Sequence, residues 1–363
     1  RLQERDFYSY NAIWERVTSV TWDAGIGDMT KRKGNDGMPE NVLLSVKDLS
    51  VRYMADRGEV QAVSDVSFDI GKGEFFGLAG ESGCGKSTIA FAVMRLLKGA
   101  ANIAGGSIEF NGKNILAFNQ GELRSFRWEK SSMVLQSAMN NLNPVITIGS
   151  QMTDAITAHE RVSAREAAER AKKLLSLVNI DENRIKAYPH ELSGGMRQRV
   201  VIAMALALKP ELVIFDEPTT ALDVVVQYNI IRKIKELKEN MGFSVLFITH
   251  DLPLMLEMCD RIAIMYAGRM AEISPVQNLL AGPAHPYTDG LLKAFPSLIG
   301  PKKKLRGIGG SVPDLITPPK GCLFYDRCFA RQKDCMAAPP PVKAIGTDHY
   351  CACYHLLNGR AKA

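Results

Sequence analysis

Two short stretches of this chain carry residue types that bind phosphate. The first, residues 80–87, reads Gly-Glu-Ser-Gly-Cys-Gly-Lys-Ser and is called the phosphate loop here. Its glycines let backbone N–H groups curl around the phosphates of a nucleotide, its lysine reaches the terminal phosphates, and its last serine coordinates Mg²⁺. The predicted nucleotide-binding residues are Gly80, Glu81, Ser82, Gly83, Cys84, Gly85, Lys86, Ser87 and Thr88.

The surroundings of the phosphate loop agree with this interpretation. The stretch Glu74–Ala79, apolar after its first residue, predicts a buried strand, and residues 87–97 predict the helix that follows it. Strand, glycine loop and helix is the context that a phosphate loop requires. A dinucleotide-binding loop needs Gly-x-Gly-x-x-Gly, but Thr88 stands three positions after Gly85. The dinucleotide alternative therefore fails.

The second stretch, called the signature segment here, precedes an apolar, alanine-rich run at residues 200–208 that predicts a helix. Its residues are Leu192, Ser193, Gly194, Gly195 and Met196. This order places a hydroxyl and bare backbone amides at a helix N-terminus, where the helix dipole favours an anion. One chain thus carries two separate phosphate-binding ends.

Two neighbouring carboxylates follow the apolar run Leu212–Phe215. A strand of this composition lies in the core of a sheet, so Asp216 and Glu217 are expected at its C-terminal edge, where ligands of open α/β sheets gather. Asp216 is the candidate Mg²⁺ ligand, and Glu217 is the candidate base that activates water for attack on the γ-phosphate. Gln136 and His250 each follow a further apolar run.

In this order the five motifs resemble those of the ATP-binding-cassette (ABC) ATPases. The resemblance implies that the phosphate loop of one subunit and the signature segment of its partner close on one ATP. It also implies that Gln136 contacts Mg²⁺ or the attacking water, that His250 contacts the γ-phosphate, and that Asp223 lies in a loop linking the two sites of the dimer. Tyr53, 27 residues before the phosphate loop, would stack on adenine; an ordinary strand aromatic is the alternative.

The fold implied by the resemblance is α/β: a P-loop NTPase (RecA-like) core with Ser87, Gln136 and Asp216 around Mg²⁺, an antiparallel β subdomain and an α-helical subdomain. Alternating apolar and polar residues at 42–53 and 60–70 predict the antiparallel strands. The helical subdomain is expected at about residues 137–195. We expect a poorly ordered N-terminal extension at residues 1–40, the cassette at 41–280, and a small cysteine-containing extension at 281–363.

The end of the chain narrows the resemblance. Ten of the seventeen prolines lie between Pro283 and Pro341. The segments 285–288 (His-Pro-Tyr-Thr), 321–324 (Gly-Cys-Leu-Phe) and 327–328 (Arg-Cys) resemble the C-terminal extension of oligopeptide, dipeptide and nickel importer ATPases. Met196 resembles the D-type subunit of these importers. The implied partners are an F-type ATPase subunit, two transmembrane permease subunits and an extracellular solute-binding protein.

Five of the seven cysteines lie in this extension. A cytoplasmic ATPase argues against disulfides, and clustered thiolates suggest a metal. The resemblance implies a four-iron, four-sulfur cluster held by Cys322, Cys328, Cys335 and Cys353, with Cys351 as an alternative fourth ligand. Zinc and free thiols are the other interpretations, although the C-x₂-C pairs common at structural zinc sites are missing.

Composition bounds the location and the partners. The longest apolar run has nine residues, against the roughly 20 that span a bilayer. We therefore expect a peripheral protein on the cytoplasmic face of the inner membrane. Residues 301–363 hold eleven Lys or Arg against four Asp or Glu, which indicates either a solvated basic tail or a surface facing anionic lipid. Without a compact basic run interleaved with aromatics, nucleic acid is not expected.

The predicted function is ATP hydrolysis that powers the uptake of di- or oligopeptides. Import of nickel or oligosaccharides by the same kind of machine is the alternative, because the ATPases of these importers resemble each other. A soluble, non-transport ABC ATPase is the second class. It is disfavoured because DNA-maintenance members insert hundreds of residues between loop and acid pair, whereas 130 positions separate Lys86 from Asp216. Translation-type members carry two cassettes.

Overall fold

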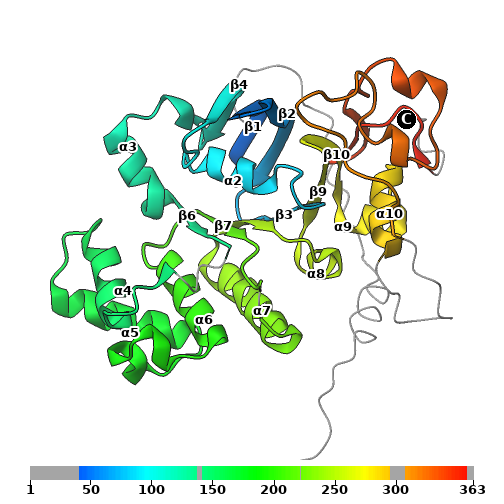
Figure 1. The fold of residues 1–363 in the computed structure, drawn as a ribbon. Helices are drawn as coiled ribbons and strands as arrows, with labels where there is room; N and C mark the ends of the chain where they lie inside the picture. The colour runs from blue at the N-terminus through cyan, green and yellow to red at the C-terminus, as the bar shows by residue number, and fades with distance from the viewer. Residues whose placement is uncertain (1–40, 137–140, 221, 295–306, 358–363) are drawn as a thin grey trace, which may run out of the picture.

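The computed structural model of the chain describes residues 41–136, 141–220, 222–294 and 307–357. Figure 1 shows a layer of antiparallel strands, a central sheet below it, helices beneath the sheet, and the C-terminal extension at one side. The predicted N-terminal extension at residues 1–40 lies outside the described residues. Among the described residues, no helix combines the length and apolar character that crossing a bilayer requires.

Within the described residues the central sheet has eight strands, of which β9, β3, β8, β7 and β6 pair in parallel. In spatial order they are β11 (Lys343–Gly346), β12 (His349–Cys351), β10 (Arg269–Pro275), β9 (Arg261–Tyr266), β3 (Phe75–Gly80), β8 (Ser244–Ile248), β7 (Leu212–Asp216) and β6 (Ser131–Val134). Every residue of β3, β7 and β8 is buried. Parallel strands covered on both faces require this continuous apolar character.

Side chains of the central sheet divide between two hydrophobic cores. Phe76 and Leu78 of β3 belong to the core that contains Ile89 of α2 (Lys86–Val93) and the antiparallel strands. Their neighbours Phe75 and Ala79 belong to the core that contains side chains of helices α4 to α10. Because successive side chains of a strand point to opposite faces, α2 and the helix after the signature segment cover opposite faces of the sheet.

The antiparallel sheet packs over α2 with the order β2, β1, β4, β5. Its strands are β1 (Val42–Ala55), β2 (Gly58–Gly71), β4 (Ala101–Phe110) and β5 (Lys113–Asn114). The predicted pair at 42–53 and 60–70 is present, and each strand extends two residues or less beyond those bounds. A turn at Asp56 and Arg57 joins them.

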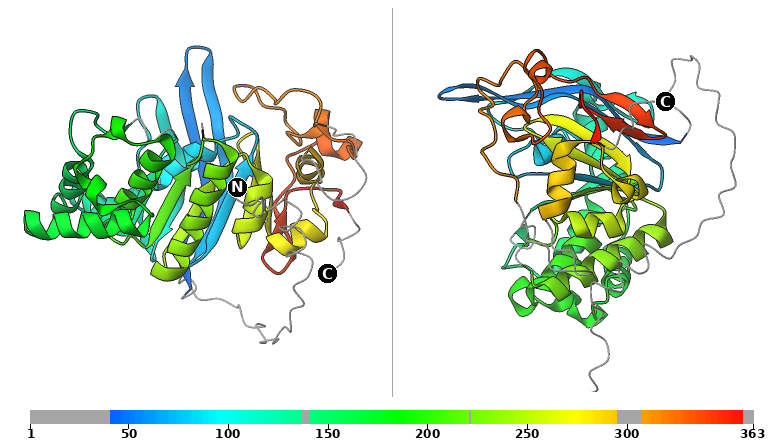
Figure 2. Two further views of the ribbon diagram at one scale, coloured as in Figure 1. Left: turned by 90° about the horizontal axis from the view of Figure 1, so that it is seen from below. Right: turned by 90° about the vertical axis from the view of Figure 1, so that its right-hand side faces the viewer.

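Two helices of the predicted helical region, and the helix that the signature segment opens, begin at side-chain caps. They are α4 (Ile148–Thr157), α5 (Ala164–Leu177) and α6 (Gly194–Ala205). Thr147, Ser163 and Ser193 stand just before them, and each side chain accepts a hydrogen bond from a backbone N–H in the first turn. Figure 2 shows these helices at one end of the molecule and the C-terminal extension at the other.

The C-terminal extension is joined to the cassette through the sheet itself. Strand β12 pairs with β10, which places Cys351 opposite Glu272. The buried Glu272 carboxylate accepts the backbone N–H groups of Ala284 and His285 and lies 2.8 Å from Nε2 of His349. A buried carboxylate is tolerated only with such partners. This network therefore anchors residues on both sides of position 281.

The remaining elements are α-helices and short 3-10 or π-helical turns, which are labelled η. They are η1 (Ile115–Ala117), α3 (Gln120–Ser125), η2 (Phe126–Lys130), η4 (Glu182–Lys186), η5 (Pro189–Glu191), α7 (Val224–Met241), α8 (Leu252–Met258), α9 (Val276–Ala281), α10 (Pro286–Ala294), η6 (Tyr325–Arg327) and η7 (Lys333–Met336). Helix α2 ends at Val93 rather than at the predicted residue 97. The chain turns there because Arg95 adopts a φ of 50° and its guanidinium donates to the carbonyl of Phe118.

Candidate active site

The phosphate loop connects β3 to α2 in a conformation that glycine makes accessible. Gly80 has a φ of 146°, and a Cβ there would lie 2.2 Å from the Met265 carbonyl oxygen. Gly85, which caps α2, has a φ of 100°, and its Cβ would lie 2.5 Å from the Ala62 carbonyl oxygen. Both positions therefore exclude side chains on steric and conformational grounds. The loop can pack against the backbone at Met265 and Ala62 because these two positions carry no side chain.

Lys86 lies folded against the phosphate loop. Its buried Nζ donates to the carbonyl oxygens of Gly80 at 2.8 Å and Glu81 at 3.0 Å, and lies 3.7 Å from the Cys84 sulfur. On nucleotide binding these partners can be exchanged for phosphate oxygens. Burial raises the pKa of Cys84, which favours the neutral, less reactive thiol.

Ser87 and Asp216 meet at the C-terminal edge of the sheet. The Ser87 hydroxyl donates to Oδ1 of Asp216 across 3.0 Å. Burial raises the pKa of Asp216, against the opposing effects of the Ser87 hydrogen bond and Lys86. A hydroxyl and a carboxylate oxygen are the hard ligands that Mg²⁺ prefers. Ser87 and Asp216, two of the three predicted Mg²⁺ ligands, therefore lie in contact, whereas the third, Gln136, is hydrogen-bonded to Glu217.

The structure brings the three predicted catalytic side chains together. Nε2 of Gln136 donates to Oε2 of Glu217 across 2.9 Å, and Nδ1 of His250 lies 3.6 Å from Oε1 of the same carboxylate. The Thr220 hydroxyl, absent from the sequence prediction, donates to Oε2 at 3.2 Å. The Glu217 N–H donates to the carbonyl of Ile248 on the neighbouring strand at 2.8 Å. The carboxylate is thus held at the end of β7 by groups from three segments.

Tyr53 stands at the rim of the same site. Its hydroxyl lies 3.4 Å from Oγ1 of Thr88, the residue after the phosphate loop. The half-buried ring belongs to β1, which lies over α2. Its stacking on adenine stays a prediction.

Comparisons with known proteins agree with this geometry. A family model described as ABC transporter matches residues 63–220, and one described as the C-terminal region of the oligopeptide/dipeptide transporters matches residues 271–335. The oligopeptide transport ATP-binding protein OppD of Salmonella typhimurium is 44% identical over 318 residues, which cover 87% of this chain and 94% of that protein. The chain belongs to the ABC transporter family. The dipeptide transport ATP-binding protein DppD of Bacillus subtilis is 43% identical over 315 residues, covering 86% of this chain and 94% of that protein.

Solved structures of ABC cassettes share the fold. A dimeric cassette in a post-hydrolysis state, bound to ADP and phosphate, has a TM-score of 0.58 and 28% identity over 64% of this chain and 99% of that chain. The protein cbiO1 of Clostridium perfringens, part of an ABC transporter complex, has a TM-score of 0.59 and 26% identity over 67% of this chain and 92% of that chain. The predicted P-loop NTPase fold is confirmed.

The signature segment of this ABC cassette opens helix α6. The Ser193 hydroxyl accepts the N–H of Met196 at 3.3 Å, and a Cβ on Gly195 would lie 2.6 Å from Cγ1 of Val226 on α7. Asp223, the predicted dimer-loop residue, caps α7 by accepting the N–H of Val226 at 2.9 Å. Helices α6 and α2 cover opposite faces of the sheet (Figure 1). The signature segment therefore opens a helix on the face opposite to the helix that follows the phosphate loop.

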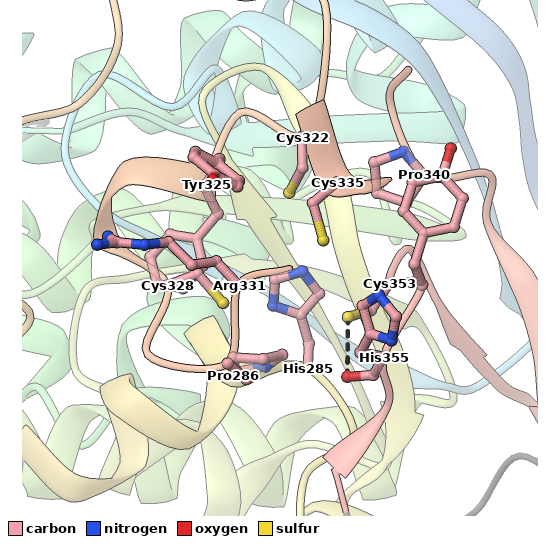
Figure 3. Close-up of a pocket in the computed structure, with 13 residues that line it drawn as sticks. His285, Pro286, Cys322, Tyr325, Cys328, Arg331, Cys335, Pro340, Cys353 and His355 are labelled. Carbon is pink, nitrogen blue, oxygen red and sulfur yellow. Dashed lines mark hydrogen bonds between the residues drawn. The ribbon is translucent and has the colours of Figure 1, made fainter. Parts of the chain in front are cut away.

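Four cysteines of the extension line one pocket. Figure 3 shows the sulfurs of Cys322, Cys328, Cys335 and Cys353 directed into it. Cys351 does not line this pocket; it is fully buried on β12, opposite Glu272. The described geometry therefore favours Cys353 over Cys351 as the fourth member of the set, which we call the cysteine site. Burial raises the pKa of Cys353 to about 11, and a bound cation would favour its thiolate.

The sequence prediction missed what holds the second residue of the phosphate loop. Glu81 was predicted only as a nucleotide-binding residue, yet its carboxylate pairs with Arg327 and its N–H donates to the Tyr287 hydroxyl. Both partners belong to the C-terminal extension. Tyr287 and Arg327 lie 206 and 246 positions after Glu81. A single sequence has no residue spacing or local pattern that indicates contacts over such distances.

Proposed function

We propose that this chain is the ATP-hydrolysing subunit of an importer of oligopeptides or dipeptides. The observation that carries the proposal is the convergence of Gln136 and His250 on Glu217, beside the paired Ser87 and Asp216, in a chain whose relatives include the oligopeptide and dipeptide transport proteins described above. The C-terminal region, matched separately, supports the same assignment.

The site residues divide the work of hydrolysis. Bound Mg²⁺, held by Ser87 and Asp216, would neutralise charge on the phosphates. Lys86 exchanges its loop carbonyls for phosphate oxygens, and the loop amides hold the β-phosphate. Glu217 accepts a proton from the attacking water, which Gln136 and His250 orient. The transition state of phosphoryl transfer asks for positioning and charge stabilisation, and these side chains provide both.

The subunit acts as half of a heterodimer. Its phosphate loop serves one ATP and its signature segment serves the ATP bound by an F-type partner subunit. The arrangement of α2 and α6 on opposite faces of the sheet supports this division. ATP bound between the two cassettes favours the closed dimer, and closure drives two transmembrane permease subunits that receive solute from an extracellular binding protein. The working location is the cytoplasmic face of the inner membrane.

The cysteine site holds a four-iron, four-sulfur cluster. Four thiols around one pocket match Cys₄ ligation. No three of these four sulfurs lie within 4.8 Å of one another, whereas sulfurs about 2.3 Å from a single zinc ion would lie closer together than that. The group Asp334, Cys335 and His355, whose ligand atoms do lie within 4.8 Å of one another, is the competing site for a single ion. The cluster would be structural, because ATP hydrolysis needs no redox step.

Reconstitution tests the transport function directly. The chain is co-expressed with its F-type partner, permeases and binding protein, and the complex is placed in proteoliposomes loaded with ATP. We expect uptake of a labelled oligopeptide, with ATP hydrolysis that rises when the peptide-loaded binding protein is added. Uptake of nickel or an oligosaccharide, without uptake of the peptide, would identify that solute class as the cargo. A rate of ATP hydrolysis that does not change when the permeases and the binding protein are added would favour the non-transport class of ABC ATPases.

A further inference from the structure

The second residue of the phosphate loop is held from outside the cassette. The Glu81 carboxylate accepts two hydrogen bonds from Arg327, from Nη1 to Oε2 and from Nη2 to Oε1, both 2.8 Å long. The Arg327 side chain is 5% exposed. The Glu81 N–H donates to the hydroxyl of the buried Tyr287 at 3.0 Å. A bidentate pair of this kind fixes the orientation of both groups.

Arg327 itself has little freedom to move. Its Nε donates to the Gly309 carbonyl at 2.9 Å, and Nη2 donates to the Ile308 carbonyl at 3.2 Å. Nη1 donates to the Tyr266 hydroxyl at 3.2 Å, and the guanidinium carbon lies 5.5 Å from the centre of that ring. Hydrogen bonding to Glu81 raises the pKa of Arg327. The guanidinium is therefore charged and held in one place.

One continuous path joins the cysteine site to the phosphate-binding lysine. Arg327 directly precedes Cys328 and ends the short turn η6 that separates Cys322 from Cys328. At the other end, the Glu81 carbonyl accepts a hydrogen bond from Nζ of Lys86. Each step is a covalent neighbour or a hydrogen bond. A shift of the η6 turn would therefore move Glu81, and with it the resting partner of Lys86.

We propose that Arg327 is a positioning residue that makes ATP affinity depend on the conformation of the cysteine site. When the site is intact, Arg327 and Tyr287 hold Glu81 so that the phosphate loop is preformed for nucleotide. When the site is opened, the η6 turn shifts, Glu81 is released, and part of the binding free energy goes into ordering the loop. The effect of an intact cysteine site rests on the metal cluster proposed above, whereas the hold of Arg327 on Glu81 does not.

The test measures the Kd of a fluorescent ATP analogue with the full chain. Arg327→Gln should raise the Kd by about tenfold, within the range typical of coupled sites, and Glu81→Gln should do the same. The double variant should bind no more weakly than either single variant, because both remove one interaction. Arg331→Gln is the matched control; this exposed arginine also lines the pocket of the cysteine site and donates to the Asp326 carbonyl, but it does not reach the loop. Lys86→Ala supplies the Kd of a disabled site.

A second arm separates positioning from general stability. Metal is counted and then removed with a chelator, and the Kd is measured again for the unsubstituted chain, Arg327→Gln and Arg331→Gln. Metal removal should weaken binding in the unsubstituted chain and Arg331→Gln, and have little further effect in Arg327→Gln. Unchanged affinity in Arg327→Gln, or an equal chelator effect in all three, would overturn the inference. If the purified chain holds no metal and Arg327→Gln still raises the Kd, the result would reject the cluster and support the positioning role.

Discussion

The Gln136 amide donates a hydrogen bond to the Glu217 carboxylate across 2.9 Å. Gln136 stands two residues after strand β6, where the chain leaves the sheet toward the helical region, whereas Glu217 is fixed at the end of β7. The bond therefore joins the candidate base to the start of a segment outside the central sheet. A movement of that segment would change how the attacking water is held.

Replacing Glu217 with glutamine should separate binding from turnover. The substitution keeps the shape of the side chain but removes the proton acceptor, so ATP hydrolysis by the reconstituted complex should fall by about 10²- to 10⁴-fold. ATP affinity should be retained, and closed dimers should accumulate. Glu236→Gln, on an exposed part of α7, is the matched control. Rapid turnover by the Glu217 variant would refute its assignment as the base.

The signature segment should act on the partner's ATP rather than on its own. In Ser193→Asp the carboxylate can still cap α6, but it places negative charge where the partner's phosphates are expected. The isolated chain should bind ATP with unchanged affinity, while ATP-dependent dimerisation in the assembly should be lost. Ser193→Thr keeps the hydroxyl and serves as control. A weakened affinity in the isolated Ser193→Asp chain would contradict the division of sites between subunits.

Two neighbouring cysteines should differ in their effect on metal content. Cys353 lines the pocket of the cysteine site, whereas Cys351 is buried on β12 outside it. Anaerobically purified protein should be brown and hold about four iron atoms per chain, as a four-iron cluster requires. Cys353→Ser should lose this iron and Cys351→Ser should keep it. Iron-free, colourless protein would reject the cluster, and one zinc ion per chain would favour the site at Asp334 and His355.

The buried His285 predicts a pH-dependent stability. Burial lowers its pKa from 6.5 to about 4, and its Nδ1 accepts the Tyr287 N–H. Below pH 6.5 the His285 imidazole binds a proton in the unfolded chain but stays neutral in the folded chain until about pH 4. The free energy of unfolding should therefore fall by about 3 kcal/mol between pH 6.5 and pH 4. His285→Asn keeps an acceptor without titrating there. Urea unfolding of the metal-free chain, with chelator present, should show a flatter dependence in this variant; the same slope as in the unsubstituted chain would contradict the assignment.

The parts of the fold that follow from local patterns were predictable. Strand β7 has five buried residues in sequence, and its end fixes Asp216 and Glu217 at one edge of the sheet. Ser193 preceded an apolar run, and it caps α6. Each of these signals spans a few residues and has a local physical cause: burial, capping or backbone freedom.

The parts that depend on distant contacts were not predictable. The pairing of β12 with β10 rests on a buried carboxylate at Glu272, which in the sequence is one acid in an apolar run. The hold of Arg327 on Glu81 joins positions 246 residues apart. Helix α2 ends early because Arg95 finds carbonyl partners on a later turn. Tertiary contacts of this kind override the local secondary-structure propensity, and no local sequence pattern indicates them.

Steady-state ATP hydrolysis by the isolated chain, compared with the same chain assembled with its F-type partner and permeases, tests the central claim most directly. Helix α2, which follows the phosphate loop, and helix α6, which the signature segment opens, cover opposite faces of the central sheet. We therefore expect that neither motif completes the other's site within a monomer. The dilute chain should therefore bind ATP with little turnover, and assembly should restore hydrolysis coupled to peptide uptake. Full turnover by a monomer at every dilution, unaffected by the permeases, would contradict the account.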